Sequence, residues 1–390
     1  MHHGKYVFSQ VMDMVVRYQF NQCVVRYHGH YRVKRFSCSE QFLAMAFGQL
    51  SFRESLRDIV VCLGAQREKL YHLGFRSMVT LPTLAKANEQ RDWRIYRDYA
   101  LTLIREARSW YGDDRPGDLV LNGTVYLIDA TTIELCLNIF PWAHYDKEQA
   151  AVKLNLELCL SGHIPSFFDF SRGQEHDIHF LDRIVFEPGA YYVFDRGYLD
   201  FARWHTLHRV GAFFVTRAKS NLSFRRQYSH PVNKRTGVRC DQTIVFAGTS
   251  ATKDYPDPLR RIKYYDTGTK RSYVFLTNNF TLAAETIALL YKYRWRIELF
   301  FKWIKQHLSV TSFWGRSANA VKTQICIALC AYLLVAILKK RLHIEKNSYE
   351  ILQILSVSLF DKTPVFRLIS EASLQSSGEE HQNQPTLWGY

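Results

Sequence analysis

The sequence predicts an α/β protein in which a mixed β-sheet with helices follows an all-helical N-terminal region and is interrupted by a β-rich insertion. Apolar residues recur at helical spacing over residues 1–118, and β-rich runs alternate with helical segments over 119–216. Short strands and turns alone fill 217–281. Helical patterns return over 282–345 and 346–390, so we place domain boundaries at these positions.

The composition narrows the class of partner. The 390-residue chain has a net charge of +15 at pH 7, and such a surplus favours a polyanion, either nucleic acid or a membrane surface. The most apolar stretch, residues 323–338, falls short of the ~20 residues that span a bilayer and predicts a buried helix. The first residues lack the apolar run of a signal peptide. We therefore expect a cytoplasmic protein that binds nucleic acid and no membrane.

The cysteines indicate neither a metal site nor a disulfide framework. None of the eight forms a CxxC pair, and Cys326 and Cys330 lie one helical turn apart inside the apolar stretch. We expect buried free thiols.

The first 118 residues predict a bundle of helices. Ser37 and Ser51 each stand three residues before a glutamate and precede an apolar segment, which is the spacing of a capping box. Pro82 is placed to begin another helix, and residues 93–111 predict a long one. With 18 basic and 12 acidic residues, the segment fits either a bundle with solvated basic faces or a DNA-end-binding domain, and we favour the second.

Two β-rich runs in the next segment each end in a carboxylate. The run 124–129 ends in Asp129, and the run 191–195 ends in Asp195. Aspartate is common where a strand gives way to a turn, so neither residue is evidence of catalysis by itself. Residues 151–170 predict two strands joined as a hairpin across Ser161 and Gly162.

The β-rich insertion carries most of the excess charge. Residues 196–281 contain 16 basic and five acidic residues, and seven basic residues lie between 217 and 239 without any acid. A basic run without counter-charge, interleaved with aromatic rings, favours a phosphate-tracking surface over an ordinary solvated face. The candidate DNA-binding residues in this run are Arg217, Lys219, Arg225 and Arg226.

A long helix expected over residues 282–308 carries one narrow polar stripe. At 100° per residue, Tyr291, Arg294, Glu298 and Lys305 fall within an arc of about 60°. A surface Arg–Glu pair, worth only ~0.3–0.5 kcal/mol, leaves the tyrosine and the lysine unexplained. A carboxylate flanked by phosphate-binding groups suits a site that holds both metal and a DNA backbone.

This spacing, Tyr-x2-Arg-x3-Glu-x6-Lys, resembles the signature of the insertion-sequence-four family of bacterial transposases. The segments VYLIDATTIEL and YYVFDRGYLDF resemble those that hold the family's two catalytic aspartates, here Asp129 and Asp195. The N-terminal helices and the segment FWGRSANAVKTQICIALCAYLLVAIL are also similar, so the likeness covers nearly the whole chain. One departure is Asn155, which takes the place of a histidine in many relatives and puts full activity in doubt.

The resemblance implies a ribonuclease H-like core and a DDE transposase. Two neighbouring strands would carry Asp129 and Asp195, and a helix would bring Glu298 to them. Two Mg²⁺ or Mn²⁺ ions would bind, with Asp129 between them and the other two carboxylates on one ion each. Phosphate groups near the cut would be held by Tyr291, Arg294 and Lys305. Further DNA-binding candidates are Lys153 and Lys302, and His176 is a candidate auxiliary residue.

The resemblance also implies partners and a reaction order. The substrate would be double-stranded DNA, both the terminal inverted repeats and the target, bound by a homodimer in a synaptic complex. Cut-and-paste relatives pass through a DNA hairpin. The alternatives are a nuclease that does not rejoin DNA and a DNA-binding regulator derived from a transposase. A structural scaffold leaves the polar stripe unexplained. The polar tail after residue 375 is expected to be disordered.

Overall fold

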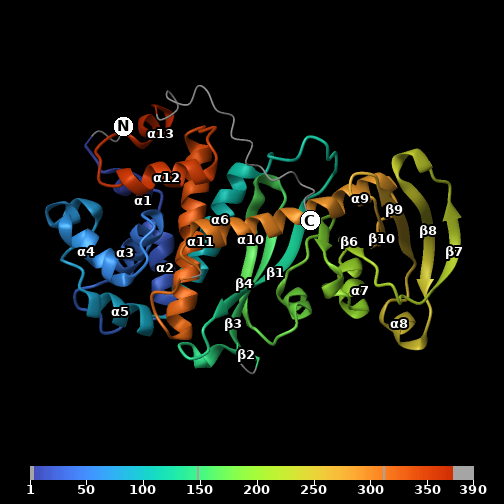
Figure 1. Cartoon of the computed structure of the whole chain (residues 1–390), viewed down its shortest axis with the longest axis horizontal. Helices are drawn as coiled ribbons and strands as arrows, with labels where there is room; N and C mark the ends of the chain where they lie inside the picture. The colour runs from blue at the N-terminus through green and yellow to red at the C-terminus, as the bar shows by residue number, and fades with distance from the viewer. Residues whose placement is uncertain (1–3, 147–148, 311, 372–390) are drawn as a thin grey trace. The chain divides into compact units, whose positions relative to one another are not determined.

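The computed structural model describes residues 4–146, 149–310 and 312–371 (Figure 1). They form two compact units. The first combines the chain up to Gly112 with Thr132–Lys153 and with the residues from Phe301 onward, and the second combines Asp113–Thr131 with Leu154–Phe300. The predicted disordered tail lies outside the described residues.

The first unit is mainly helical, as the sequence predicts for its N-terminal part. The helices from both ends of the chain are α1 (Val7–Met12), α2 (Arg17–Arg26), α3 (Cys38–Leu50), α4 (Leu56–Ala65), η1 (Arg67–Leu73), α5 (Leu81–Gln90), α6 (Arg94–Tyr111), α11 (Ala318–Arg341), α12 (Ser348–Ser358) and α13 (Val365–Glu371). Pro82 lies in the first turn of α5, where its missing N–H costs no hydrogen bond.

One of the two predicted capping boxes is present. Ser37 forms the complete box at the start of α3. The prediction for Ser51 is wrong, because this residue ends α3 and its hydroxyl donates to the Phe47 carbonyl oxygen (2.6 Å). Ser55 caps α4 instead, and its Oγ accepts from the backbone N–H of Asp58 (3.1 Å). A serine hydroxyl that bonds to the preceding helical turn is unavailable to cap the following helix.

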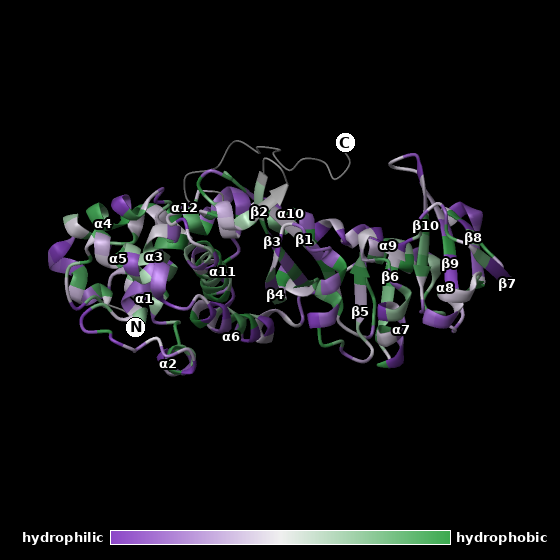
Figure 2. Cartoon of the chain, turned by 90° about the horizontal axis from the view of Figure 1, so that it is seen from below, coloured by the Kyte–Doolittle hydropathy of each residue, from purple (hydrophilic) through white to green (hydrophobic). Residues whose placement is uncertain are grey.

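Helix α11 is the buried apolar helix that the sequence predicts (Figure 2). Among the described residues, it is the one helix long and apolar enough to cross a membrane, and 94% of its most apolar window is buried by protein. It packs against α6 and α3. The amide of Gln324 is satisfied there, because it donates to the Ser312 carbonyl (2.9 Å) and accepts from the Trp314 N–H (2.8 Å).

The cysteines are free thiols, as expected, but not all are buried. Five are buried, Cys62 and Cys240 are half-buried, and Cys136 is exposed. Cys136 follows the end of a strand directly, in a turn at the surface.

The second unit is built on the mixed sheet that the sequence predicts. The strand order is β3-β1-β5-β6-β10-β9-β8-β7, and β4 also pairs with β3 as the predicted hairpin partner. Strands β1, β5 and β6 are parallel, whereas β6, β10, β9, β8 and β7 pair antiparallel. The strands are β1 (Val125–Leu135), β3 (Gln149–Cys159), β4 (Ile164–Arg172), β5 (Tyr191–Phe194), β6 (Phe213–Arg217), β7 (Phe224–His230), β8 (Val238–Phe246), β9 (Leu259–Asp266) and β10 (Arg271–Thr277), and β2 (His144–Asp146) pairs with the start of β3.

The single long helix expected over residues 282–308 is divided at Arg294. Helix α9 (Ala284–Tyr293) ends directly before this residue and α10 (Trp295–His307) begins directly after it. The Arg294 N–H donates to the Tyr291 carbonyl (3.1 Å), and the Ile297 N–H donates to the Arg294 carbonyl (3.2 Å). These bonds span three residues instead of four, so the helix tightens locally at Arg294.

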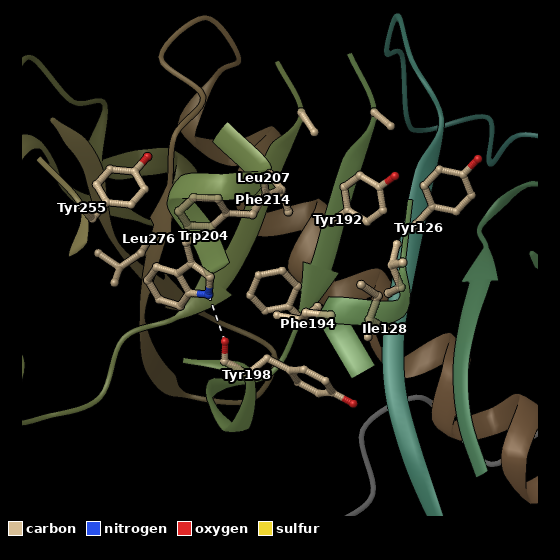
Figure 3. Packing of buried hydrophobic residues seen from close by; sticks show 14 of the residues in the cluster. Tyr126, Ile128, Tyr192, Phe194, Tyr198, Trp204, Leu207, Phe214, Tyr255 and Leu276 are labelled. Carbon is tan, nitrogen blue, oxygen red and sulfur yellow. Dashed lines mark hydrogen bonds between the residues drawn. The ribbon is translucent and has the colours of Figure 1, made fainter. Parts of the chain in front are cut away.

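An aromatic core fixes β1 and β5 in the second unit (Figure 3). The rings of Tyr126 on β1 and Tyr192 on β5 are stacked with centroids 5.2 Å apart. Phe194 and Phe214 flank Trp204, which lies on α7 (Phe201–Arg209) and is fully buried. A cluster of this size holds the strand ends to one geometry, which any site built on them requires.

Candidate active site

The two predicted aspartates lie on neighbouring parallel strands. The register pairs Ile128 of β1 with Phe194 of β5, and Asp129 and Asp195 are the next residues along the two strands. The sequence places Asp129 at the end of its strand, and this is wrong, because β1 continues to Leu135. Asp195 does follow the last residue of β5 directly.

Each aspartate is held by the backbone beside it. Oδ1 of Asp129 accepts from the Ala130 N–H (2.9 Å), and Oδ1 of Asp195 accepts from the Gly197 N–H (2.6 Å). The second bond closes the short helix η5 (Arg196–Tyr198) against the end of β5. A Cβ at position 197 would lie 2.8 Å from Oδ1 of Asp195, so glycine is what permits this close approach.

Arg294 joins two of the three predicted carboxylates. Its Nη1 lies 3.2 Å from Oδ2 of Asp129, and its Nη2 lies 2.6 Å from Oε1 of Glu298, one helical turn further along α10. The guanidinium also lies over the ring of Tyr291, 5.8 Å from its centroid. These contacts place Tyr291, Arg294 and Glu298 on one side of the helix, as the predicted stripe requires.

Burial makes the carboxylate of Asp129 unusually basic. Burial raises its pKa from 3.8 to about 7; the Arg294 guanidinium and the Ala130 N–H oppose this shift, whereas Asp195 and Glu298 add to it. The charges of Asp195 and Glu298 are therefore close enough to act on Asp129. A carboxylate whose charge is costly in isolation is well suited to bind a cation.

The carboxylates are not arranged as a closed metal site in the structure. Within the described part of the chain, no three His, Cys, Asp or Glu residues are close enough together to hold an ion. Arg294 lies between Asp129 and Glu298 and supplies the positive charge there. The donor set nevertheless consists of carboxylate oxygens alone, which is the ligand type that Mg²⁺ and Mn²⁺ prefer.

The other residues of the predicted stripe are engaged with protein. The ring of Tyr291 packs against Phe275 of β10, with centroids 5.0 Å apart. Nζ of Lys305 donates to the Thr132 carbonyl oxygen (2.8 Å), and burial lowers the pKa of this lysine. Both terminal nitrogens of Arg294 donate to carboxylates in this structure.

Most of the predicted DNA-binding cations of the insertion are exposed. Lys219, Arg225 and Arg226 are exposed, as is Lys302 on α10. Arg217 is half-buried, with its guanidinium 5.0 Å from the ring centroid of Tyr273. Lys153 is half-buried on β3.

Two further candidates have structural partners. His176 is exposed and caps the short helix η4 (Asp177–Arg183), where its Nδ1 accepts from the Ile178 N–H (3.3 Å). Asn155 is buried on β3, and its Nδ2 donates to Oγ of Ser171 on β4 (2.9 Å). These contacts assign both residues a role in the local fold.

One buried residue near the carboxylates, Tyr198, was not predicted from the sequence. Tyr198 ends η5, three residues after Asp195, and is buried with its hydroxyl close enough to Asp129 and Asp195 to be affected by their charges. The tyrosine stands in a short motif, Asp-Arg-Gly-Tyr, in which the sequence alone gives no reason to prefer it.

The chain is similar to transposases over most of its length. Residues 122–334 match the family described as Transposase DDE domain, and residues 3–76 match a domain of unknown function. A Sinorhizobium fredii protein named as transposase y4zB is 35% identical over 65% of this chain and 70% of its own length. A Geobacillus stearothermophilus transposase named for insertion sequence element IS5377 is 31% identical over 54% of this chain and 55% of its own length.

The chain also matches a less similar transposase and a solved structure. A Synechocystis transposase named for insertion sequence element IS4SA is 24% identical over 67% of this chain and 72% of its own length. The match to the cryo-EM structure of the piggyBac transposase synaptic complex with hairpin DNA covers 94% of this chain and 80% of that one, with 10% identity and a TM-score of 0.45. On the family match and the sequence relatives, the chain belongs to the DDE transposases of insertion sequences, enzymes that cut DNA and transfer its strands.

Proposed function

We propose that Asp129, Asp195 and Glu298 are the catalytic carboxylates of this transposase. The observation that carries the proposal is the side-by-side position of Asp129 and Asp195 on parallel strands, together with the tie from Asp129 through Arg294 to Glu298. The parallel order β1-β5-β6, with the third carboxylate on a helix, supports the ribonuclease H-like core that the resemblance implies.

Two Mg²⁺ or Mn²⁺ ions would be held by Asp129, Asp195 and Glu298. Such a pair of ions supplies activation of the attacking oxygen and stabilisation of the leaving oxygen in phosphodiester chemistry. The raised pKa of Asp129 supports this assignment, since a nearby cation would favour the ionised carboxylate.

Arg294 would bind a DNA phosphate near the cut. In this structure its guanidinium pairs with Asp129 and Glu298. Released from these carboxylates, the guanidinium would bind a phosphate with bidentate geometry. Tyr291, beneath the guanidinium, limits the positions that Arg294 adopts.

Double-stranded DNA would contact the basic surface of the insertion. Arg217, Lys219, Arg225 and Arg226 would neutralise phosphates of the terminal repeats, and Lys153, Lys302 and Lys305 would add contacts of the same kind. Three of the four predicted DNA-binding cations of the insertion are exposed, which supports this part of the proposal. A homodimer would synapse two DNA ends in the bacterial cytoplasm, and cleavage would pass through a hairpin before strand transfer.

Substitution of the carboxylates tests the proposal. Asp129→Asn, Asp195→Asn and Glu298→Gln are expected to abolish cleavage of DNA that carries the element's end, while binding of the same DNA without metal is retained. Glu134→Gln, which changes an exposed carboxylate further along β1, is the matched control and should cleave normally. Full cleavage by any of the three variants would remove that residue from the site. Pre-cleaved ends measure strand transfer separately, and cleavage without joining would instead indicate a nuclease.

A further inference from the structure

The hydroxyl of Tyr198 is a buried polar group that contributes no hydrogen bond to the fold of the described residues. Only 1% of the residue's surface is exposed, and no described residue forms a hydrogen bond with the hydroxyl. Burying a hydroxyl without a partner costs roughly 1–3 kcal/mol. Phenylalanine would fill the same space without that cost, so the hydroxyl is a candidate for a role outside stability.

The backbone and ring of Tyr198 are held firmly. Its N–H donates to the Asp195 carbonyl (3.2 Å), and its own carbonyl accepts from Nε1 of Trp204 (2.9 Å; Figure 3). The ring packs against Phe194 with centroids 5.9 Å apart. In Figure 3 the ring points away from Trp204, toward the side on which Ile128 and β1 lie. The aromatic core thus aims one hydroxyl toward the strand that carries Asp129.

The charges around this hydroxyl are those of the proposed catalytic site. Burial is the main cause that raises the pKa of Tyr198, and the carboxylates of Asp129, Asp177 and Asp195 raise it further, whereas Arg294 lowers it. The hydroxyl therefore remains protonated at every physiological pH and is available as a hydrogen-bond donor. Anionic carboxylate oxygens are the strongest acceptors in its surroundings.

Asp129 is the acceptor that the direction of the ring favours, because the ring points toward β1, the strand that carries this residue. Oδ1 of each aspartate already accepts from a backbone N–H, at 2.9 Å for Asp129 and at 2.6 Å for Asp195. Oδ2 of Asp129 lies 3.2 Å from Nη1 of Arg294, and it loses that donor if the guanidinium turns to a phosphate. A new donor would then hold the carboxylate in one orientation, as the outer hydrogen bonds around metal-binding carboxylates do.

We propose that Tyr198 is a positioning residue whose hydroxyl donates to the Asp129 carboxylate when the enzyme holds DNA and divalent cations. The inference rests on the proposed function, because it takes Asp129 as a catalytic carboxylate. It gives the buried hydroxyl, which has no hydrogen-bond partner among the described residues, an acceptor in the loaded enzyme. Tyr198 itself touches neither substrate nor the reacting atoms.

The substitution Tyr198→Phe separates this role from a structural one. In the metal-free protein the variant should unfold at the same temperature as the wild type or a higher one, because a buried unpaired hydroxyl is removed. The Mn²⁺ concentration at the midpoint of the metal-induced rise in melting temperature should increase about tenfold, and cleavage of end DNA should need correspondingly more Mn²⁺. Binding of end DNA without metal should not change.

Tyr255→Phe is the matched control. Tyr255 belongs to the same aromatic core and is equally buried, but its hydroxyl bonds to Nδ1 of His208 (2.7 Å). This variant should lower the melting temperature and leave the Mn²⁺ midpoint unchanged. A Tyr198→Phe enzyme with the wild-type Mn²⁺ midpoint and cleavage rate would overturn the inference, as would a clear loss of metal-free stability. Failure of the proposed site itself would show differently, as cleavage by Asp129→Asn.

Discussion

The carboxylate site and strand β7 of the insertion are both rich in charge, but the charges of the site are buried and those of β7 are exposed. In the site, Asp129 and Arg294 are largely buried and bonded to each other, so each charge depends on its partner. On β7, Arg225 and Arg226 are exposed, and water solvates them. Charge in the site therefore acts through geometry, and charge on β7 acts through number and salt-sensitive attraction. Four predictions test this difference.

The largest effect is expected at a buried ion pair inside the insertion. Arg260 and Asp241 have side chains that are each 8% exposed, and two short bonds join them (2.9 and 2.6 Å). Arg260→Ala leaves Asp241 buried without its partner and should cost about 3–5 kcal/mol of unfolding free energy. Denaturant unfolding measures this. A loss below about 1 kcal/mol, the value typical of surface pairs, would show that the insertion has no buried electrostatic geometry of its own.

The pH dependence of stability tests the burial of Asp129. Its pKa is about 7 in the folded protein and 3.8 as the ordinary value, so between these values the folded protein binds a proton that the unfolded chain has released. The free energy of unfolding of the metal-free protein should therefore fall as the pH rises from about 4 to about 7, by on the order of 2–4 kcal/mol. Asp129→Asn should lack this fall. Parallel pH profiles for the two proteins would refute the burial argument.

A single methyl group should damage the site without removing any charge. Gly197→Ala places a Cβ 2.8 Å from Oδ1 of Asp195 and forces the carboxylate to move. A displacement on the order of 1 Å is expected to reduce cleavage about 10²-fold. Gly117→Ala is the control, because a Cβ there meets no atom within 4 Å. Equal cleavage rates for the two variants would mean that the turn after β5 tolerates movement.

The smallest effects are expected on the exposed strand β7. Arg225→Ala and Arg226→Ala should each weaken end-DNA binding severalfold and reduce the slope of log affinity against log salt by about 0.9. Lys253→Ala changes an exposed cation on α8 (Thr249–Asp254), outside the basic run, and should leave the slope unchanged. If all three variants gave the same slope, the insertion would have no preferred track for phosphates.

The sequence predicted the structure correctly where residues close together in the chain determine it. The capping box at Ser37, the buried helix α11 and the β-hairpin depend on periodicity and neighbouring residues, and all three are present. The prediction for Ser51 was wrong because this residue lies between two helices, and its hydroxyl bonds to the earlier helix instead of capping the later one. Such a competition is decided by tertiary packing that a spacing rule does not contain.

The contacts among the proposed site residues were predictable only in part. Helical spacing predicts Arg294 beside Glu298, and the resemblance to the transposase family implies the neighbouring strands that bring Asp129 beside Asp195. The bond from Arg294 to Asp129 joins residues 165 positions apart and could not be read from spacing. Tyr198 was missed for a similar reason, since only the packed core shows that its hydroxyl has no partner.

The position of β7–β10 in the chain also bears on synthesis. These strands precede α10, so a ribosome completes the cationic surface before it adds Glu298. A chain that ended between the two would therefore carry the exposed cations of the insertion without the third carboxylate of the proposed site.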